Sequence, residues 1–126
     1  MSEALGIHIL LDVAEAPFST LDDPGLLESA LRQAVEDMGA NLLGVHIHRL
    51  SPQGLSGVAV ISESHLTVHT WPELGEAAAD LFTCGDAGRA RQAIQNLAGR
   101  LGGKSEVREL PRGMRHSAQT VRGLAP

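Results

Sequence analysis

Hydrophobic side chains recur along the chain with two different periods, and these periods predict its helices and strands. Residues 5–13 and 41–50 are rich in Leu, Ile and Val and are predicted to be strands. In residues 24–38 the apolar side chains fall at helical spacing, after an Asp-Pro start and before a glycine stop. Residues 87–101 show the same spacing and end at a Gly-Gly pair. The pattern therefore predicts two strands and two helices outside the middle of the chain.

The middle and the end of the chain add further elements. Residues 56–61 and 66–71 are predicted to be strands, joined by a polar Ser-Glu-Ser-His step. Residues 77–84 are ambiguous, because their alanines favour helix while Leu, Phe and Thr allow strand. Residues 105–110 are compatible with a last strand. Residues 111–126, with three Arg and few apolar side chains, are expected to form a loose tail.

Strands in hairpins together with two separate helices predict an α+β fold. The expected architecture is a two-layer sandwich, in which helices cover one face of a mainly antiparallel sheet. The length of 126 residues, 43% of them hydrophobic, suits one domain over residues 1–126. The other face of such a sheet would need a partner.

Composition excludes several classes of protein. A net charge of -5 argues against nucleic-acid and membrane-surface binding, which need concentrated Lys and Arg. No apolar run approaches the roughly 20 residues of a membrane span, and the first residues lack the basic region of a signal peptide, so we expect a cytoplasmic protein. The single Cys84 can form no internal disulfide, so any role that it has is that of a thiol.

The candidate chemistry is concentrated in residues 57–85, which hold the only Trp, the only Cys and two of the six His. On an unbroken strand Ser64 and His69 would point to opposite faces, because their separation of five is odd. If both serve one site, we expect the chain to turn within residues 62–65.

The sequence SESHLTVHTWPE, residues 62–73, resembles the self-processing centre of the prokaryotic S-adenosylmethionine decarboxylases, pyruvoyl-dependent enzymes that cut their own chain. The resemblance extends over about residues 5–110 and is most specific between residues 54 and 85. It implies a strand for residues 77–84. It also implies that two sheets pack face to face, which gives a four-layer αββα dimer.

The resemblance implies a modified residue as the cofactor. A decarboxylase must stabilise a carbanion, and no ordinary side chain offers an electrophilic carbonyl. In the family the pyruvoyl group comes from a serine, here Ser64, after the chain is cut at the Glu63–Ser64 bond. A β chain of residues 1–63 and an α chain of residues 64–126 would result. The pyruvoyl carbonyl would then form a Schiff base with the amine of the substrate.

Three further residues match positions with roles in the family. His69 matches the base of the processing step, and Ser56 matches a serine that assists the same step. Cys84 matches the proton donor in turnover, a role that suits a thiol because free thiols are mostly protonated at neutral pH. Without the surrounding motif, Ser64 would be an ordinary polar residue and Cys84 a small hydrophobic one.

The chain departs from the family where the substrate's adenine is stacked. The family carries two Phe in a pattern like FHRF, and here Ile47 and Leu50 stand at those positions. Base stacking on an aromatic ring is worth about 1 to 3 kcal/mol, so its loss changes substrate recognition. The candidate substrate contacts are Leu50 and Glu73, of which Glu73 is the last residue of the WPE motif. Because a basic substrate would need an acidic partner, Glu76 and Asp12 are further candidates.

Three functions therefore stay open on the sequence. The first is decarboxylation of S-adenosylmethionine for spermidine biosynthesis. The second is a pyruvoyl-dependent L-ornithine or L-arginine decarboxylase of the same family. The third is a non-catalytic regulatory partner, which an intact set of processing and proton-donor residues opposes. All three involve either a small-molecule substrate or a protein partner, and a homodimer of αβ units is expected.

A metal centre is not expected from the sequence. His46, His48, His65 and His69 could imitate a metal cluster, but no carboxylate or cysteine pattern completes it. We therefore expect a pyruvoyl cofactor with neither a metal nor pyridoxal phosphate.

Overall fold

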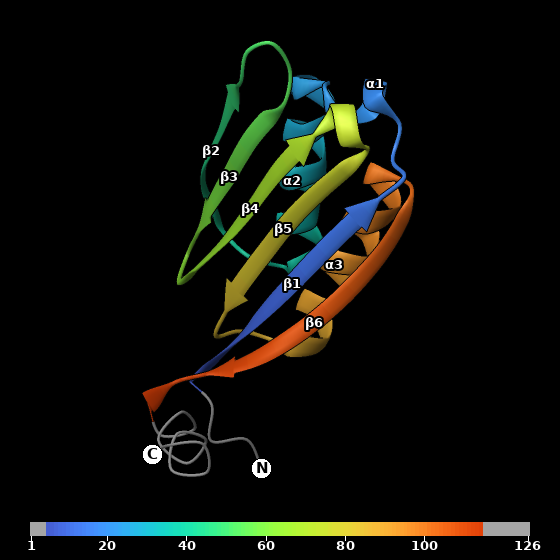
Figure 1. Ribbon diagram of the computed structural model, residues 1–126. Helices are drawn as coiled ribbons and strands as arrows, with labels where there is room; N and C mark the ends of the chain where they lie inside the picture. Colours follow the sequence, from blue (N-terminus) through green and yellow to red (C-terminus); the bar gives the residue numbers. More distant parts are fainter. Residues whose placement is uncertain (1–4, 115–126) are drawn as a thin grey trace.

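Six strands pair in the order β2-β3-β4-β5-β1-β6, each antiparallel to its neighbours, in the computed structural model (Figure 1). The structure describes residues 5–114. The strands are β1 (Gly6–Ala14), β2 (Leu42–Arg49), β3 (Leu55–Ile61), β4 (Ser64–Trp71), β5 (Glu76–Thr83) and β6 (Lys104–Arg112). The helices are α1 (Phe18–Leu21), α2 (Pro24–Met38), the 3-10 helix η1 (Pro72–Leu74) and α3 (Ala87–Leu101).

The two long helices have the predicted bounds because capping residues stand at their ends in the sequence. The Asp23 side chain accepts a hydrogen bond from the backbone of Leu26, and α2 ends at Gly39 in the left-handed conformation, φ 68°. The Asp86 side chain caps α3 in the same way, through the backbone N–H of Arg89 at 3.1 Å. The short α1 and η1 were not predicted, since neither is long enough to show a helical period.

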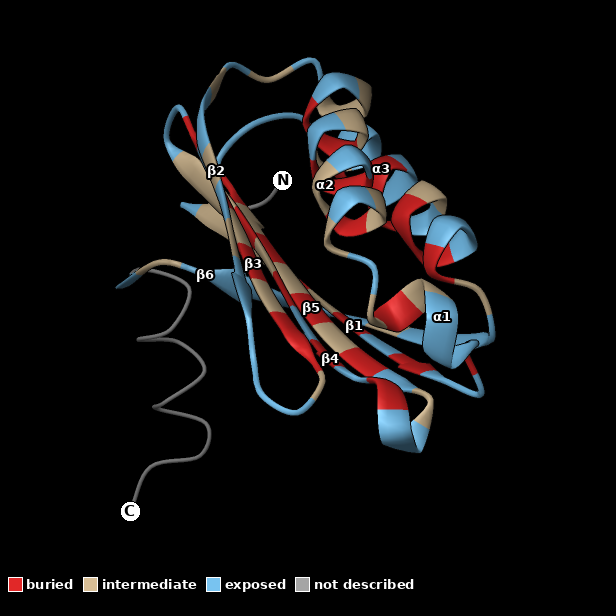
Figure 2. Cartoon of the chain, turned by 90° about the horizontal axis from the view of Figure 1, so that it is seen from above, coloured by how far each residue is buried: buried red, intermediate tan, exposed pale blue. Residues whose placement is uncertain are grey.

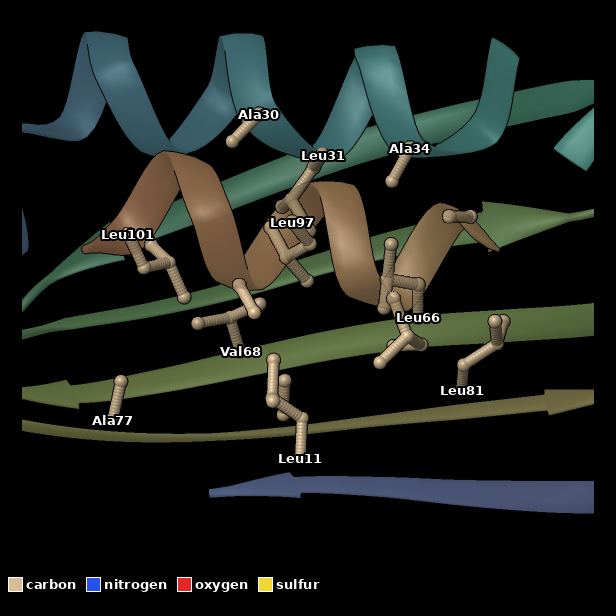
Figure 3. Packing of buried hydrophobic residues seen from close by; sticks show 14 of the residues in the cluster. Leu11, Ala30, Leu31, Ala34, Leu66, Val68, Ala77, Leu81, Leu97 and Leu101 are labelled. Carbon is tan, nitrogen blue, oxygen red and sulfur yellow. The ribbon is translucent and has the colours of Figure 1, made fainter. Parts of the chain in front are cut away.

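Both long helices lie on one face of the sheet, which confirms the predicted α+β sandwich (Figure 2). Alternate residues of the strands point toward the helices and form the core with them, as Leu11, Leu66, Leu81, Leu31 and Leu97 show (Figure 3). Alanines on α2, α3 and β5 share this core, so the helices approach the sheet closely. The other face of the sheet is covered by no helix of the described residues.

The hairpin between β3 and β4 is tighter than predicted. Ile61 pairs with Ser64, so Ser62 and Glu63 alone make the turn. Residues 64 and 65, which we expected in the turn, already belong to β4. Ser64 and His69 both lie on β4, so the turn does not bring them to one face within a single copy of the chain.

Residues 77–83 of the ambiguous segment belong to a strand, β5, which pairs with β4 on one side and β1 on the other, and Cys84 follows the strand. Its alanines therefore serve close packing on a buried face instead of helix formation. The last strand is longer than predicted, because Pro111 and Arg112 pair with β1. The predicted tail thus begins later than residue 111, and its residues 115–126 lie outside the described residues.

Among residues 5–114, no helix is both long and apolar enough to span a membrane.

Candidate active site

Ser64 and Cys84 line the same cavity, of about 450 Å³, beside the β3–β4 hairpin. Sheet register brings them together, because Ser64 pairs with Thr83 and Cys84 follows directly. Arg89 of α3 and Asn41, which precedes β2, also line the cavity, and its other polar residues are Ser62, Glu63, Thr83 and Asp86. Cys84 is exposed. The cavity thus offers a hydroxyl and an accessible thiol, the two groups that the sequence analysis placed in the chemistry.

Glu63, directly before Ser64, has a left-handed backbone with φ 62°. Such a conformation costs a residue with a side chain about 1 to 2 kcal/mol, and glycine adopts it freely. Glu63 is the second of the two residues in the turn between Ile61 and Ser64, which are paired across the hairpin. Backbone strain is therefore stored next to the Glu63–Ser64 peptide bond.

Ser56 and His69 form a second pair on the uncovered face of the sheet. They are direct partners across β3 and β4, and Ser56 Oγ lies 3.0 Å from His69 Nδ1. Ser64 lies on the same strand as His69 but on the other face and five residues away, about 16 Å along the strand. Within one copy the structure therefore brings Ser56 to His69 and Ser64 to Cys84, and keeps the two pairs apart.

A cluster centred on Asp80 occupies the uncovered face at the Ser64 end of β4. Asp80 Oδ2 lies 2.6 Å from His8 Nε2 and 3.0 Å from His65 Nε2. The Thr67 hydroxyl donates to the other carboxylate oxygen. Partial burial acts to raise the pKa of Asp80. Hydrogen bonds from the threonine and the two histidines outweigh that effect, so the pKa lies below the ordinary value.

His8, His65 and Asp80 are also the described residues best placed to hold a metal ion, since their ligand atoms lie within 4.8 Å of one another. Arg112 Nη1 lies 3.0 Å from His8 Nδ1, and a guanidinium can only donate, so the proton of this neutral ring sits on Nε2 and points at Asp80. A metal ion would have to displace that proton. The hydrogen bonds therefore account for this cluster without an ion. It shares only His65 with the four histidines considered in the sequence.

The candidate substrate contacts lie at the far end of the sheet from Ser64. Leu50 is 42% exposed and packs against Gly54, and Trp71 is 43% exposed on the same end. Glu73 lies in the exposed first turn of η1. Ile47 is different: it faces the helices, with its δ-methyl 3.0 Å from where a Cβ on Gly57 would stand. Of these two residues, Ile47 packs against the core and Leu50 is exposed.

The other two acidic candidates, Asp12 and Glu76, do not line the cavity of Ser64. Asp12 is exposed and pairs with Arg108 of β6, with 2.5 Å between Oδ2 and Nη2. Glu76 begins β5, opposite Trp71, and is exposed. The residues that the sequence analysis missed are His8 and Asp80, which are 72 positions apart and meet only through the pairing of β1 with β5.

Comparisons with known proteins show what the chain is similar to. The family model described as S-adenosylmethionine decarboxylase matches residues 7–113. The S-adenosylmethionine decarboxylase proenzyme of Methanococcus maripaludis (strain S2) is 45% identical over 111 residues, 87% of this chain and 91% of that protein. The proenzyme of the same name from Carboxydothermus hydrogenoformans is 44% identical over 112 residues, 88% of each chain.

A solved structure is similar to the whole described fold. The crystal structure of the adenosylmethionine decarboxylase from Aquifex aeolicus superposes with a TM-score of 0.83 and 29% identity. It covers 90% of this chain and 94% of its own. The helix layer, the hairpin that carries Ser64 and all of the sheet except Gly6 fall within the matched range 7–113.

Proposed function

The chain belongs to the S-adenosylmethionine decarboxylase family, and from that premise we propose how its residues carry out self-cleavage and decarboxylation. Its activity is the decarboxylation of S-adenosylmethionine, a lyase reaction that serves polyamine biosynthesis. The ornithine or arginine alternative is not favoured, because the relatives and the solved structure described above are all named for adenosylmethionine. A non-catalytic partner is not favoured either, since these names all denote enzymes.

Cleavage begins with attack of Ser64 Oγ on the carbonyl carbon of Glu63. An ester C–O bond forms as the peptide C–N bond breaks, and the amine of Ser64 is released. Removal of the Cα proton of Ser64 then expels Glu63 from Cβ as a free carboxylate. The enamine left at position 64 takes up water and loses ammonia, which gives the pyruvoyl ketone.

Two observations support this placement of the cut. The strained backbone at Glu63 raises the energy of the hairpin before the cut, and cleavage releases it. The cavity gives the new group space beside Cys84, since Ser64 and the thiol share one lining. The residues at position 64 and around it thus fit a pyruvoyl group, which supplies the electron-accepting carbonyl that no ordinary side chain has.

His69 serves as the base from a second copy of the chain. In its own copy it lies about 16 Å along β4 from Ser64, too far for proton transfer. Nδ1 of His69 is engaged with Ser56 Oγ at 3.0 Å, and His69 is exposed on the uncovered face, so its Nε2 is the nitrogen that would accept the proton. Two sheets packed face to face about an axis across the strands bring each Ser64 end over the partner's Ser56–His69 pair.

The substrate contacts follow the same division between copies. Leu50 and Glu73 lie at the His69 end of the sheet, far from the Ser64 of their own copy. In the face-to-face dimer they meet a substrate whose amino-acid end is held at the partner's position 64. Cys84, which lines the cavity of Ser64, returns a proton to the substrate carbon after carbon dioxide leaves. The uncovered face carries the exposed apolar side chains Val60, Trp71 and Leu110, which such a dimer would cover.

Intact-mass spectrometry of the purified chain tests the cut. We expect two pieces that begin at residues 1 and 64, with a carbonyl at the start of the second that reacts with a hydrazide probe. Release of labelled carbon dioxide from carboxyl-labelled S-adenosylmethionine tests the activity, with ornithine and arginine as comparisons. A folded chain that stays whole would refute the proposal.

Mixed dimers test the origin of the base. Ser64→Ala and His69→Ala chains with different tags are produced separately and together, and cleavage is followed by mass. Neither variant should be cut efficiently alone, whereas in the mixed pair the His69→Ala chain keeps its serine and receives the partner's histidine. If the mixed pair forms and remains uncut, His69 does not act across the dimer.

A further inference from the structure

Ser64 occupies a different position in the chain before and after cleavage. In the uncut chain it is held in a closed hairpin, paired with Ile61 and Thr83 on its two sides. After the proposed cut, on which this inference rests, position 64 is a free chain end. Chain ends of strands fray unless something holds them. The reacting group must nevertheless stay beside Cys84.

The next residue along the strand has the contacts to hold that end. The His65 side chain points to the face opposite Ser64, and its Nε2 lies 3.0 Å from Asp80 Oδ2. Its ring also stacks on Phe82 of β5, with centroids 6.1 Å apart and 26° between the planes. The ring is thus fixed by a charge-assisted hydrogen bond and by packing.

Asp80 is in turn fixed from three directions. It receives hydrogen bonds from Thr67 and His65 on β4 and from His8 on β1, and it stands on β5 between those two strands. Arg112 of β6 reaches the other nitrogen of His8 at 3.0 Å. The carboxylate of Asp80 therefore joins the first residues of β4 to β5, which carries it, and to β1. Its side chain is only 26% exposed, so water competes weakly for these bonds.

We propose that Asp80 is the positioning residue of the cleaved enzyme: through His65 it anchors the chain end that cleavage creates and keeps position 64 beside Cys84. It does not line the cavity of Ser64, since it lies on the opposite face of the sheet. An asparagine in its place could not accept all three hydrogen bonds, because one of its two polar groups only donates.

Four proteins test the anchor: the cut wild type and the uncut Ser64→Ala chain, each with and without Asp80→Asn. Hydrogen exchange of the amides of residues 65–68 is measured by mass spectrometry, together with the thermal midpoint. In the uncut chain the hairpin still holds the strand, so we expect Asp80→Asn to speed exchange at most about threefold. In the cut chain we expect Asp80→Asn to speed exchange about tenfold or more and to lower the thermal midpoint further than in the uncut chain.

Asp37→Asn is the matched control. Asp37 also accepts hydrogen bonds at 3.1 Å each, from Gln33 of its own helix α2 and from Asn96 of α3, and the second bond joins the two helices. It should lower the midpoint equally in cut and uncut chains and leave residues 65–68 unchanged. His65→Gln, at a half-exposed residue, should repeat the Asp80→Asn pattern and replaces it should that variant not fold.

Activity gives a second measurement. Asp80→Asn should lower kcat with little change in KM. A larger fraction of turnovers should end in inactivation, because the proton would reach the carbon at position 64 instead of the substrate carbon. Equal exchange effects in cut and uncut chains would overturn the anchor while the function stands. A wild-type chain that is never cut would overturn the proposed function, and the anchor with it.

Discussion

The hydroxyl of Ser56 lies 3.0 Å from Nδ1 of His69, across two adjacent strands and on the sheet face that no described helix covers. This hydrogen bond fixes the orientation of the imidazole and leaves its second nitrogen free. Ser56→Ala should therefore slow self-cleavage by about tenfold, which corresponds to about 1.4 kcal/mol and to one lost hydrogen bond. The rate is followed by gel or mass after synthesis. Ser105→Ala, at an exposed serine on β6, should leave the rate unchanged.

Cys84 separates cutting from turnover. Because its thiol lines the cavity of Ser64 but takes no part in the ester step, Cys84→Ala should still be cut. Its decarboxylation should fall by about a hundredfold, in the range that removal of a general acid produces. The measurement is kcat on protein whose cleavage has first been shown by mass. An unchanged kcat in fully cut Cys84→Ala would remove Cys84 from the proposal.

The strain at Glu63 should assist the cut. Asparagine tolerates the left-handed conformation better than glutamate, so Glu63→Asn should raise the thermal midpoint of the uncut Ser64→Ala chain. In the chain that retains Ser64, the same change should slow cleavage by up to about fivefold, equivalent to about 1 kcal/mol. Glu15 is a matched control, since its φ is 60° and it lies far from the cut in the sequence. Glu15→Asn should raise stability and leave the cleavage rate alone.

Leu50 and Ile47 should respond differently to an aromatic ring. Leu50→Phe, at an exposed position beside Gly54, should lower KM for S-adenosylmethionine about tenfold and change kcat little, because stacking binds ground and transition states alike. Ile47→Phe overfills a packed site against α2 and should cost about 1 to 3 kcal/mol of stability without a gain in affinity. Steady-state kinetics and chemical denaturation distinguish the two. If Leu50→Phe leaves KM unchanged, Leu50 does not contact the adenine.

The lowered pKa of Asp80 predicts a pH dependence of stability. Because its folded pKa lies below the unfolded value, its ionised form stabilises the fold above about pH 4, and this contribution is lost as the pH falls through the folded pKa. His8 and His65 face it from the two neighbouring strands, each with its Nε2 within hydrogen-bond distance of Oδ2. The Asp12–Arg108 pair lines the groove beside it.

Urea denaturation between pH 3 and pH 7 tests this dependence, with pH limits set around the ordinary aspartate value. The difference in stability between wild type and Asp80→Asn should be largest at the upper limit and shrink toward the lower one. Asp37, whose pKa is also lowered by its hydrogen bonds, remains in both proteins and cancels in the comparison. A difference that is constant with pH would contradict an ionised Asp80 in the network.

The sequence was sufficient for the helices and insufficient for the site. Pro24 and Gly39 mark the two ends of α2 in the sequence itself, so its bounds could be predicted. The hairpin was misjudged because Ser64 and His65 are polar and yet belong to β4. These polar residues are tolerated in the strand because Ser64 faces the cavity and His65 faces the charged Asp80. Both the cavity and Asp80 involve residues far away in the sequence, so no short-range pattern indicates them.

Which side chains share a face depends on register, and register was not predicted. Ile47 and Leu50 are three residues apart, and only the pairing of Ile47 with Gly57 places it under α2. The Asp80 cluster depends on β1 and β5 being neighbours, which no short-range pattern indicates. The family resemblance supplied Ser64, His69 and Cys84, but it did not indicate that one copy keeps the first two apart.

The strand order has a consequence for the two pieces that a cut at Glu63–Ser64 would produce. The first piece would contain β1, β2 and β3, and the second β4, β5 and β6. In the sheet, β1 lies between β5 and β6, paired with each of them (Figure 1). The pieces would therefore be interleaved, and neither could leave without pulling a strand out of the interior of the sheet. Once cut, the two pieces would stay together as one folded unit. In a mixture of two different cut enzymes, the piece of residues 1–63 from one would not exchange with that from the other while both are folded.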